Sequence, residues 1–263
     1  MAQPGNAVEK ALLILDFISL HGPAGKSDIS RAVGINRTTA HRLMTTLEAH
    51  GYIMRNHDNR YVPGLKALGF YRLAHSHEPT ASVRTKLQDA ATRVNATVHL
   101  ALCSPEGVLV VDKFDPPDAL VAYNLVGRVV PFHATALGKA YLATVDTPVR
   151  ERILQNISWD AYTSHTIASA ARMLQEISEI QRRGYATEHD ELNFGFSCIA
   201  VAFAGEQGKR APVAISISGP THIHLVNQSD LVSALRALQE EVGGLLGDFP
   251  LASGIRDVVP SSE

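Results

Sequence analysis

Near its amino end, the sequence holds the pattern that most restricts the fold: a short amphipathic segment, a glycine and a longer two-sided segment. In the short segment, Ile29, Ala32 and Val33 share one helical face. We expect Ser27 to cap the start of this helix and Gly34 to end it, since glycine tolerates positive φ. Two helices joined by so short a turn must pack against each other as a helix-turn-helix.

The longer segment has one side for packing and one side for hydrogen bonding. Asn36 is placed to cap a helix that we predict to end near His50. Ala40, Leu43 and Leu47 form its apolar side. The opposite side carries donors and acceptors whose lengths suit base edges and phosphates in a major groove: Arg37, Thr38, His41, Arg42 and Thr45.

The flanking segments complete a known DNA-binding arrangement. An earlier helix is capped by Asn6, stops at Gly22-Pro23 and has an apolar stripe of Val8, Ala11, Leu12, Leu15 and Ile18. After the longer helix, residues 52–55 and 60–62 are predicted strands of a hairpin, the wing. The whole order predicts a winged helix-turn-helix that binds double-stranded DNA. Its candidate DNA-binding residues are Ser27, Asn36, Arg37, Thr38, Thr39, His41, Arg42, Arg55 and Arg60.

Composition supports a folded, two-part chain. The 263 residues are 45% hydrophobic and 19% charged, values that exclude wholesale disorder. Residues 1–75 carry a net charge of +4 and residues 76–263 one of −6, so only the amino end is suited to a polyanion. Two cysteines exclude a disulfide framework and a Cys-rich zinc site. We expect no membrane segment and no secretory signal, and hence a cytoplasmic protein.

The remainder alternates between helical and strand patterns, which predicts a second, α+β domain. The first part of it should contain a helix over 80–95, strands over 97–103, 108–114 and 120–125, and helices over 135–144 and 147–157. The second part should contain a helix over 168–183, strands over 185–188, 198–203 and 212–218, and a helix over 229–246 capped by Ser229. A connecting helix from about Gly64 to His75 is expected to break before Pro79.

Two features of this domain are candidate sites for a small molecule. Thr135 is placed to cap a helix whose first N–H groups attract an anion such as a carboxylate, although a plain capped helix is the alternative. Gly138-Lys139 does not complete a nucleotide-binding loop, because such a loop requires glycine at the position that His133 occupies. Farther on, Ser216 and Ser218 are two residues apart on a strand, so their hydroxyls share a face turned to water or to a polar ligand.

An enzyme and a metal site are the alternative readings of this domain. Cys198 and His133 form a conceivable nucleophile pair, with Glu188 orienting the histidine. However, Cys198 lies in an apolar run and no nucleophile elbow is present. The same residues with His189 lack the close spacing of metal ligands, and His75, His77, His222 and His224 are expected to be solvated. We therefore predict no enzyme, no metal and no cofactor.

Specific motifs make the chain resemble the IclR family of bacterial transcription regulators. The similar segments are SDISRAVGINRTTAHRL at 27–43, LEAHGY at 47–52 and YVPG at 61–64. Residues 80–245 look like that family's effector-binding domain, which has a GAF-like fold. The resemblance implies a winged helix-turn-helix at 1–63, a linker helix at 64–79, an effector-binding domain at 80–250 and a flexible tail at 251–263.

The resemblance also implies a function and a set of binding residues. Family members bind a roughly palindromic operator as a homodimer or homotetramer and respond to a small effector, here expected to be an organic acid. Carried over, the effector contacts are the N–H groups of Ala136 and Leu137 and the side chains of Glu188, Cys198, Ser216 and Ser218. A Cys/His enzyme tethered to DNA remains the alternative.

Overall fold

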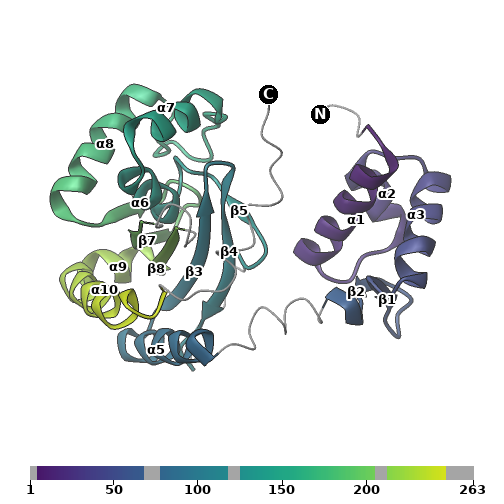
Figure 1. Cartoon of the computed structure of the whole chain (residues 1–263), viewed down its shortest axis with the longest axis horizontal. Helices are drawn as coiled ribbons and strands as arrows, with labels where there is room; N and C mark the ends of the chain where they lie inside the picture. Colours follow the sequence, from purple (N-terminus) through teal and green to yellow (C-terminus); the bar gives the residue numbers. More distant parts are fainter. Residues whose placement is uncertain (1–4, 68–77, 118–124, 205–211, 247–263) are drawn as a thin grey trace. The chain divides into compact units, whose positions relative to one another are not determined.

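The computed structural model describes residues 5–67, 78–117, 125–204 and 212–246. The chain divides into two compact units, Met1–Ser76 and His77–Glu263 (Figure 1). The first unit is mainly helical, and the second has an antiparallel sheet with helices packed on both faces. These features confirm the predicted α+β class.

Within residues 5–64, three helices and a two-stranded hairpin build the first unit. They are α1 (Ala7–His21), α2 (Lys26–Val33), α3 (Arg37–Ala49), β1 (Ile53–Arg55) and β2 (Tyr61–Pro63). Asn6 and Asn36 cap α1 and α3 as predicted, and Gly34 ends α2 with φ at 69°. The helices and the hairpin share one apolar core, formed by Ile14, Ile18, Ala24, Ile29, Val33, Ala40, Met44, Ile53 and Tyr61. The predicted winged helix-turn-helix is therefore confirmed.

The start of α2 differs from the prediction. Ser27 is not its cap, because the helix begins at Lys26, two residues earlier than predicted, after Gly25, and no side chain caps it. Ala32, predicted to be buried, is exposed. Ser30 is buried in its place and donates a hydrogen bond to the Ile35 carbonyl at 2.6 Å. The short helix therefore turns a hydroxyl, rather than a third apolar side chain, toward the turn that follows it.

The buried stripes of α1 and α3 are also rotated from the predicted ones. Val8 and Leu12 are exposed, whereas Ile14 at the centre of the buried side is fully covered. In α3 the covered centre is Ala40 and Met44, with the two predicted leucines only partly buried beside them. Several apolar residues compete for one helical face here, so spacing alone did not identify its centre.

Among the described residues of the second unit, the strands form a six-stranded antiparallel sheet in the order β5-β4-β3-β8-β7-β6. Its strands are β3 (Thr97–Ser104), β4 (Gly107–Phe114), β5 (Val129–Val130), β6 (Ala186–His189), β7 (Phe196–Phe203) and β8 (Val213–Pro220). The helices are α5 (Glu78–Val94), α6 (Ala136–Thr144), α7 (Thr147–Asn156), α8 (Ala170–Arg183), α9 (Thr221–Val226) and α10 (Gln228–Gly243).

Different side chains cover the two faces of this sheet. Helices α5 and α10 lie on one face, where branched residues such as Ile199, Ile215 and Ile217 fill the core. Helices α6, α7 and α8 lie on the other (Figure 1), where alanines such as Ala186 and Ala200 dominate the strands. Because alanine leaves little side chain between backbones, α6 approaches this face closely.

Several predicted segments of the second unit were wrong or fall outside the described residues. Of the strand predicted over 120–125, only Leu125 is described and it is not in a strand; β5 pairs with β4 instead. Helix α9 was missed because its six residues are too few for a clear period. Ser229 does not cap α10, which begins at Gln228 after Asn227.

The predicted linker helix and tail lie almost entirely outside the described residues. Residues 65–67 are helical, and residues 68–77 and 247–263 are not described. Most of the predicted break, residues 75–77, lies outside the described residues, but Glu78, expected to be non-helical, is the first residue of α5. Proline fits the first turn of a helix, where no hydrogen bond from its nitrogen is required.

The start of α6 is a close backbone crossing. Thr135 caps the helix as predicted: its hydroxyl accepts a hydrogen bond from the Gly138 N–H at 3.1 Å and donates one to the Pro131 carbonyl at 2.7 Å. A Cβ atom on Gly138 would lie 2.4 Å from the Cα of Phe132. Only glycine therefore fits the third position of this helix.

Replacing Gly138 with alanine should destabilise the second unit by about 2–3 kcal/mol, because backbone atoms, not a flexible side chain, block the added methyl group. Trp159, the single tryptophan of the chain, packs 5.4 Å from the ring of His133 and reports unfolding of this unit by fluorescence. Gly244→Ala is the control, since nothing lies within 4 Å of its Cβ position. Equal unfolding midpoints for the two variants would contradict the close crossing.

Candidate functional site

The polar side of α3 faces solvent. Arg37, Thr38, His41, Arg42 and Thr45 are all exposed, and Thr39 is half-buried. The opposite side of the helix is anchored in the core of the first unit. Within the described residues, nothing of the first unit covers the predicted groove-facing side chains, so this side is available for a ligand the size of a duplex.

The start of α2 adds a cation to this surface. The Nζ atom of Lys26 lies 3.5 Å from Nδ1 of His41 on α3. Ser27, the next residue, is exposed in the first turn. The sequence does not predict Lys26 as a DNA-binding residue, because a cap at Ser27 would leave it in the loop before α2. Its place beside a predicted groove-facing residue suits a phosphate contact.

The two wing arginines differ in their surroundings. Arg55 is held by the first unit itself, with Nε 3.1 Å from Oε1 of Glu48 and Nη1 2.9 Å from Oδ1 of Asn59. Arg60 lies 3.8 Å from Asp28 with half of its side chain exposed. Arg60 is therefore the freer cation of the pair, and Arg55 also braces the hairpin against α3.

In the second unit, the register of the sheet gathers the predicted effector residues. Glu188 on β6 is directly opposite Cys198 on β7, which is directly opposite Ser218 on β8. Ser216 lies two residues before Ser218. Residues opposite each other on neighbouring strands point to the same side of a sheet. The four side chains thus form one polar cluster on the face covered by α6.

The residues of this polar cluster differ in burial. Glu188, Ser216 and Ser218 are buried, while Cys198, on an inner strand, is partly exposed as a residue. Cys198 is therefore the least covered residue of the four.

A buried ion pair joins the start of α6 to the cluster. Nζ of Lys139, which is 1% exposed, lies 2.6 Å from Oε1 of Glu191. Oε1 of Glu188 accepts hydrogen bonds from the N–H groups of Glu191 at 2.7 Å and Leu192 at 3.2 Å. A buried lysine needs such a partner. The pair brings the first turn of α6 next to the carboxyl end of β6.

The first turn of α6 keeps free donors. Ala136 and Leu137 are 1% and 3% exposed. Among the backbone hydrogen bonds of the described residues, none satisfies the N–H group of either residue. With the N-terminal end of the helix dipole behind them, these groups favour a negative charge.

Burial controls the protonation of the cluster. It raises the pKa of Glu188 to about 7, against the effect of its two backbone N–H donors. Burial and the neighbouring Glu188 hold the pKa of the Cys198 thiol well above its usual range. Near neutral pH the cluster therefore presents a thiol, two hydroxyls and a carboxyl group that gains or loses a proton easily.

One further histidine belongs to the cluster. His99 on β3 is directly opposite Ser216, and its Nδ1 atom is 3.4 Å from Oγ of Ser218. Burial, with a smaller contribution from Lys113, lowers its pKa to about 4, so the ring is neutral. The alternation of Thr97 and His99 with apolar residues on a predicted strand was the signal that could have found it.

The geometry of the described residues does not support the enzyme or the metal-site alternative. His133 donates a hydrogen bond from Nε2 to the Asp160 carbonyl at 3.0 Å, and its ring lies near those of Trp159 and Tyr162; in the described part of the chain no contact joins it to Cys198. No group of three or more His, Cys, Asp or Glu side chains among the described residues is arranged to hold a metal ion. His75 and His77 lie outside the described residues, and His224 is buried rather than solvated.

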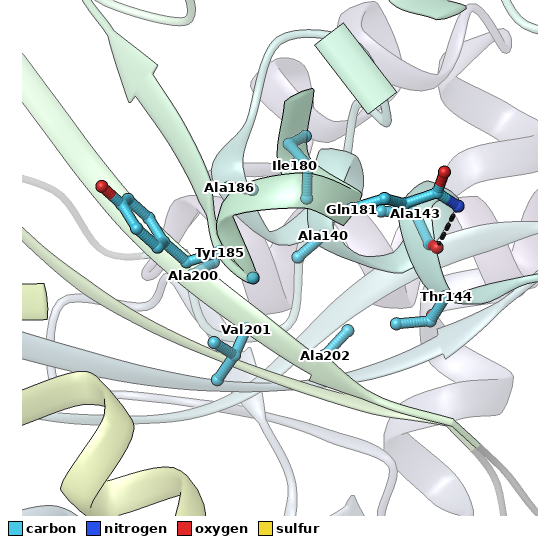
Figure 2. Close-up of a pocket in the computed structure, with 11 residues that line it drawn as sticks. Ala140, Ala143, Thr144, Ile180, Gln181, Tyr185, Ala186, Ala200, Val201 and Ala202 are labelled. Atoms are coloured by element: carbon cyan, nitrogen blue, oxygen red, sulfur yellow. Dashed lines mark hydrogen bonds between the residues drawn. The ribbon is translucent and has the colours of Figure 1, made fainter. Parts of the chain in front are cut away.

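Two hollows lie apart from the polar cluster. An apolar groove with a volume of about 240 Å³ lies between the ends of α6 and α8 and strand β7, lined by residues such as Ala140, Ile180 and Ala202 (Figure 2). A more polar hollow of about 460 Å³ lies near the start of α8, beside Arg172 and Glu176. None of the six predicted effector residues lines either hollow.

No helix in the described ranges is long and apolar enough to span a bilayer.

Comparison with known proteins identifies both units. The family model described as the bacterial transcriptional regulator IclR C-terminal matches residues 72–243. The model of the IclR helix-turn-helix domain matches residues 7–57. The HTH-type transcriptional regulator XynR of Escherichia coli (strain K12) is 29% identical over 240 residues, which cover 89% of this chain and 93% of that protein.

Solved structures agree with these matches. The IclR transcriptional regulator from Alicyclobacillus acidocaldarius aligns with a TM-score of 0.77 and 26% identity, covering 94% of this chain and 98% of that one. An IclR homologue from Microbacterium hydrocarbonoxydans, solved in complex with 4-hydroxybenzoate, aligns with a TM-score of 0.71 and 20% identity, covering 92% of this chain and 99% of that one. At that identity the second alignment shows the fold alone.

Glu188→Gln should remove a pH dependence from the stability of the second unit. The pKa of Glu188 rises from 4.5 to about 7 on folding, so the unfolded chain loses the proton first and ionisation destabilises the fold as pH rises through this window. As pH rises from 5 to 8, the free energy of unfolding of the wild type should fall by about 2 kcal/mol relative to that of the variant. Trp159 fluorescence follows the unfolding of both proteins.

The matched control for this pH experiment is Glu151→Gln, which changes an exposed glutamate on α7. Its stability should follow the wild-type profile. Parallel pH profiles for Glu188→Gln and the wild type would mean that the Glu188 carboxyl titrates as it does in the unfolded chain.

Proposed function

Because the chain belongs to the IclR family of bacterial transcriptional regulators, we propose that α3 reads its operator and that the polar cluster beneath α6 binds the effector. The observation that carries the proposal is the two-sided packing of α3. Its apolar side is locked in the first unit while its hydrogen-bonding side is exposed.

The DNA contacts are assigned by position on the first unit. Asn36, at the start of α3, the exposed residues Arg37, Thr38, His41 and Arg42 of that helix, and the half-buried Thr39 face the major groove. Ser27 and Lys26 contact phosphates beside it, and Arg55 and Arg60 place the wing on the backbone or the minor groove. Two copies of the chain, in a homodimer or homotetramer, present two such helices to a roughly palindromic operator.

The effector is a small organic acid. Its carboxylate lies at the free N–H groups of Ala136 and Leu137, and its remaining polar atoms contact Glu188, Cys198, Ser216 and Ser218. The relative solved with 4-hydroxybenzoate supports a carboxylate ligand for this fold. The effector changes operator affinity to the extent that it binds the DNA-competent and incompetent states unequally.

The remaining expectations form part of the same proposal. The chain acts without catalysis, cofactor or metal, in line with relatives that are named as regulators. It works in the cytoplasm, where its DNA lies. Residues 64–79 link a DNA-binding domain at 1–63 to an effector-binding domain at 80–250, and residues 251–263 are a tail.

Arg42→Ala should weaken binding to the specific operator by about 1–3 kcal/mol if the guanidinium contacts a guanine, and should change binding to random duplex much less. Fluorescence anisotropy with both duplexes at fixed salt measures the two affinities. Arg152→Ala, which removes an exposed arginine on α7, is the control with equal charge loss. Equal losses on operator and random duplex would make Arg42 a phosphate contact.

Ser216→Ala combined with Ser218→Ala should abolish the effector response and leave operator binding intact, because both hydroxyls lie in the second unit. A thermal-shift screen of organic acids, 4-hydroxybenzoate included, first finds an acid that stabilises the wild-type chain. That acid is then titrated into the operator complex of each variant. Ser233→Ala, an exposed serine on α10, is the control. An unchanged titration in the double variant would remove both serines from the site.

A further inference from the structure

We propose that His99 is an additional effector-binding residue, and that its Nε2 atom selects an acid that carries a hydroxyl group. The inference rests on the proposed effector function of the polar cluster and goes beyond it by adding a residue and narrowing the ligand class to hydroxycarboxylic acids. The sequence motifs did not single out this histidine.

The register of the sheet places His99 in the cluster. Its strand, β3, lies beside β8, and His99 is directly opposite Ser216, while Ser218 is opposite Thr97. Its side chain therefore shares a face with both serines. The 3.4 Å separation between Nδ1 and Oγ of Ser218 supports the same placement.

The outer nitrogen of the ring lacks a partner. His99 is 3% exposed, and no hydrogen-bond partner for Nε2 exists among the described residues. Folded proteins pair almost all buried polar atoms, and exceptions call for an explanation. Since Nδ1 already contacts a serine of the proposed site, a ligand bound at the polar cluster is the partner that explains the free nitrogen.

The hydrogen-bond chain behind the ring narrows the chemistry of this ligand. A neutral imidazole has one donor and one acceptor nitrogen. If Ser218 donates to the Thr97 carbonyl, 3.5 Å away, His99 donates from Nδ1 and Nε2 accepts. If Ser218 instead donates to Nδ1, Nε2 carries the hydrogen and donates. A hydroxyl group on the ligand satisfies both arrangements, whereas a carbonyl satisfies only the second.

The charges around His99 direct the carboxylate elsewhere. Lys113, opposite His99 on β4, is paired with Asp115 at 2.8 Å, and Lys139 is paired with Glu191. Glu188 on β6 adds an acidic group to the same face. Both nearby lysines are therefore balanced, and burial keeps the ring of His99 neutral. The acid's carboxylate is left for the free N–H groups of α6 and its hydroxyl for His99.

Matched acids test this assignment directly. The probes are 3-hydroxypropionate with propionate, 3-hydroxybutyrate with butyrate, and 3-hydroxybenzoate with benzoate, measured by calorimetry on the full chain. For at least one pair the wild type should bind the hydroxy acid about tenfold or more tightly. His99→Leu should lose this preference but keep the affinity for the plain acid, and His99→Gln, which retains an amide donor and acceptor, should restore part of it.

The controls separate this inference from the proposed function. His224→Leu removes another buried histidine with an unpartnered ring nitrogen, on α9, and should leave the preference unchanged. The Trp159 unfolding transition shows whether each variant folds, and His99→Gln carries the test if His99→Leu does not fold.

Three results would overturn the assignment. A preserved preference in His99→Leu, or a preference in His99→Gln as strong as that of the wild type, would remove the histidine from the site while leaving the effector function standing. A wild type that prefers the plain acids would reject the hydroxyl assignment. If no probe acid binds the wild type, the organic-acid effector itself fails, and this inference fails with it.

Discussion

The packing of Ala40 and Met44 against α1, α2 and the hairpin determines what the first unit can do. These residues are fully covered, so α3 cannot rotate about its axis without exposing them. Its polar residues are therefore fixed on the outer side. The Asn36 cap fixes where the helix begins, and the wing returns to the same core through Tyr61, which pairs with the backbone of Ala24.

An analogous constraint operates in the second unit, with strand register in place of helix rotation. Because Glu188, Cys198 and Ser218 are directly opposite one another, their side chains cannot leave the α6 face unless a strand slips by one residue. Such a slip would also drive Ile199 and Ile217 out of the other core. The apolar face thus holds the polar cluster together, and Gly138 lets α6 approach it.

The sequence predicted the positions of helices and strands better than it predicted which of their residues are buried. The helices and most strands were predicted because each has a clear period and an identifiable cap or stop. Errors arose where several apolar residues compete for one face, as in α1, or where a helix is very short, as in α9. The four predicted effector side chains were known to be candidates, but only strand pairing brings them together. His99 escaped notice because its role depends on which strand lies beside β3, and Lys26 because it depends on how α2 meets α3.

Methylation interference on the operator tests the central claim most directly. Methylation at N7 of guanine blocks the major groove, and methylation at N3 of adenine blocks the minor groove. If α3 of each copy enters the major groove, methylated guanines should block binding in two half-sites whose centres lie about one helical turn, or a multiple of it, apart. Interference confined to adenine N3, or no interference at any guanine of a duplex that the chain binds specifically, would contradict the account.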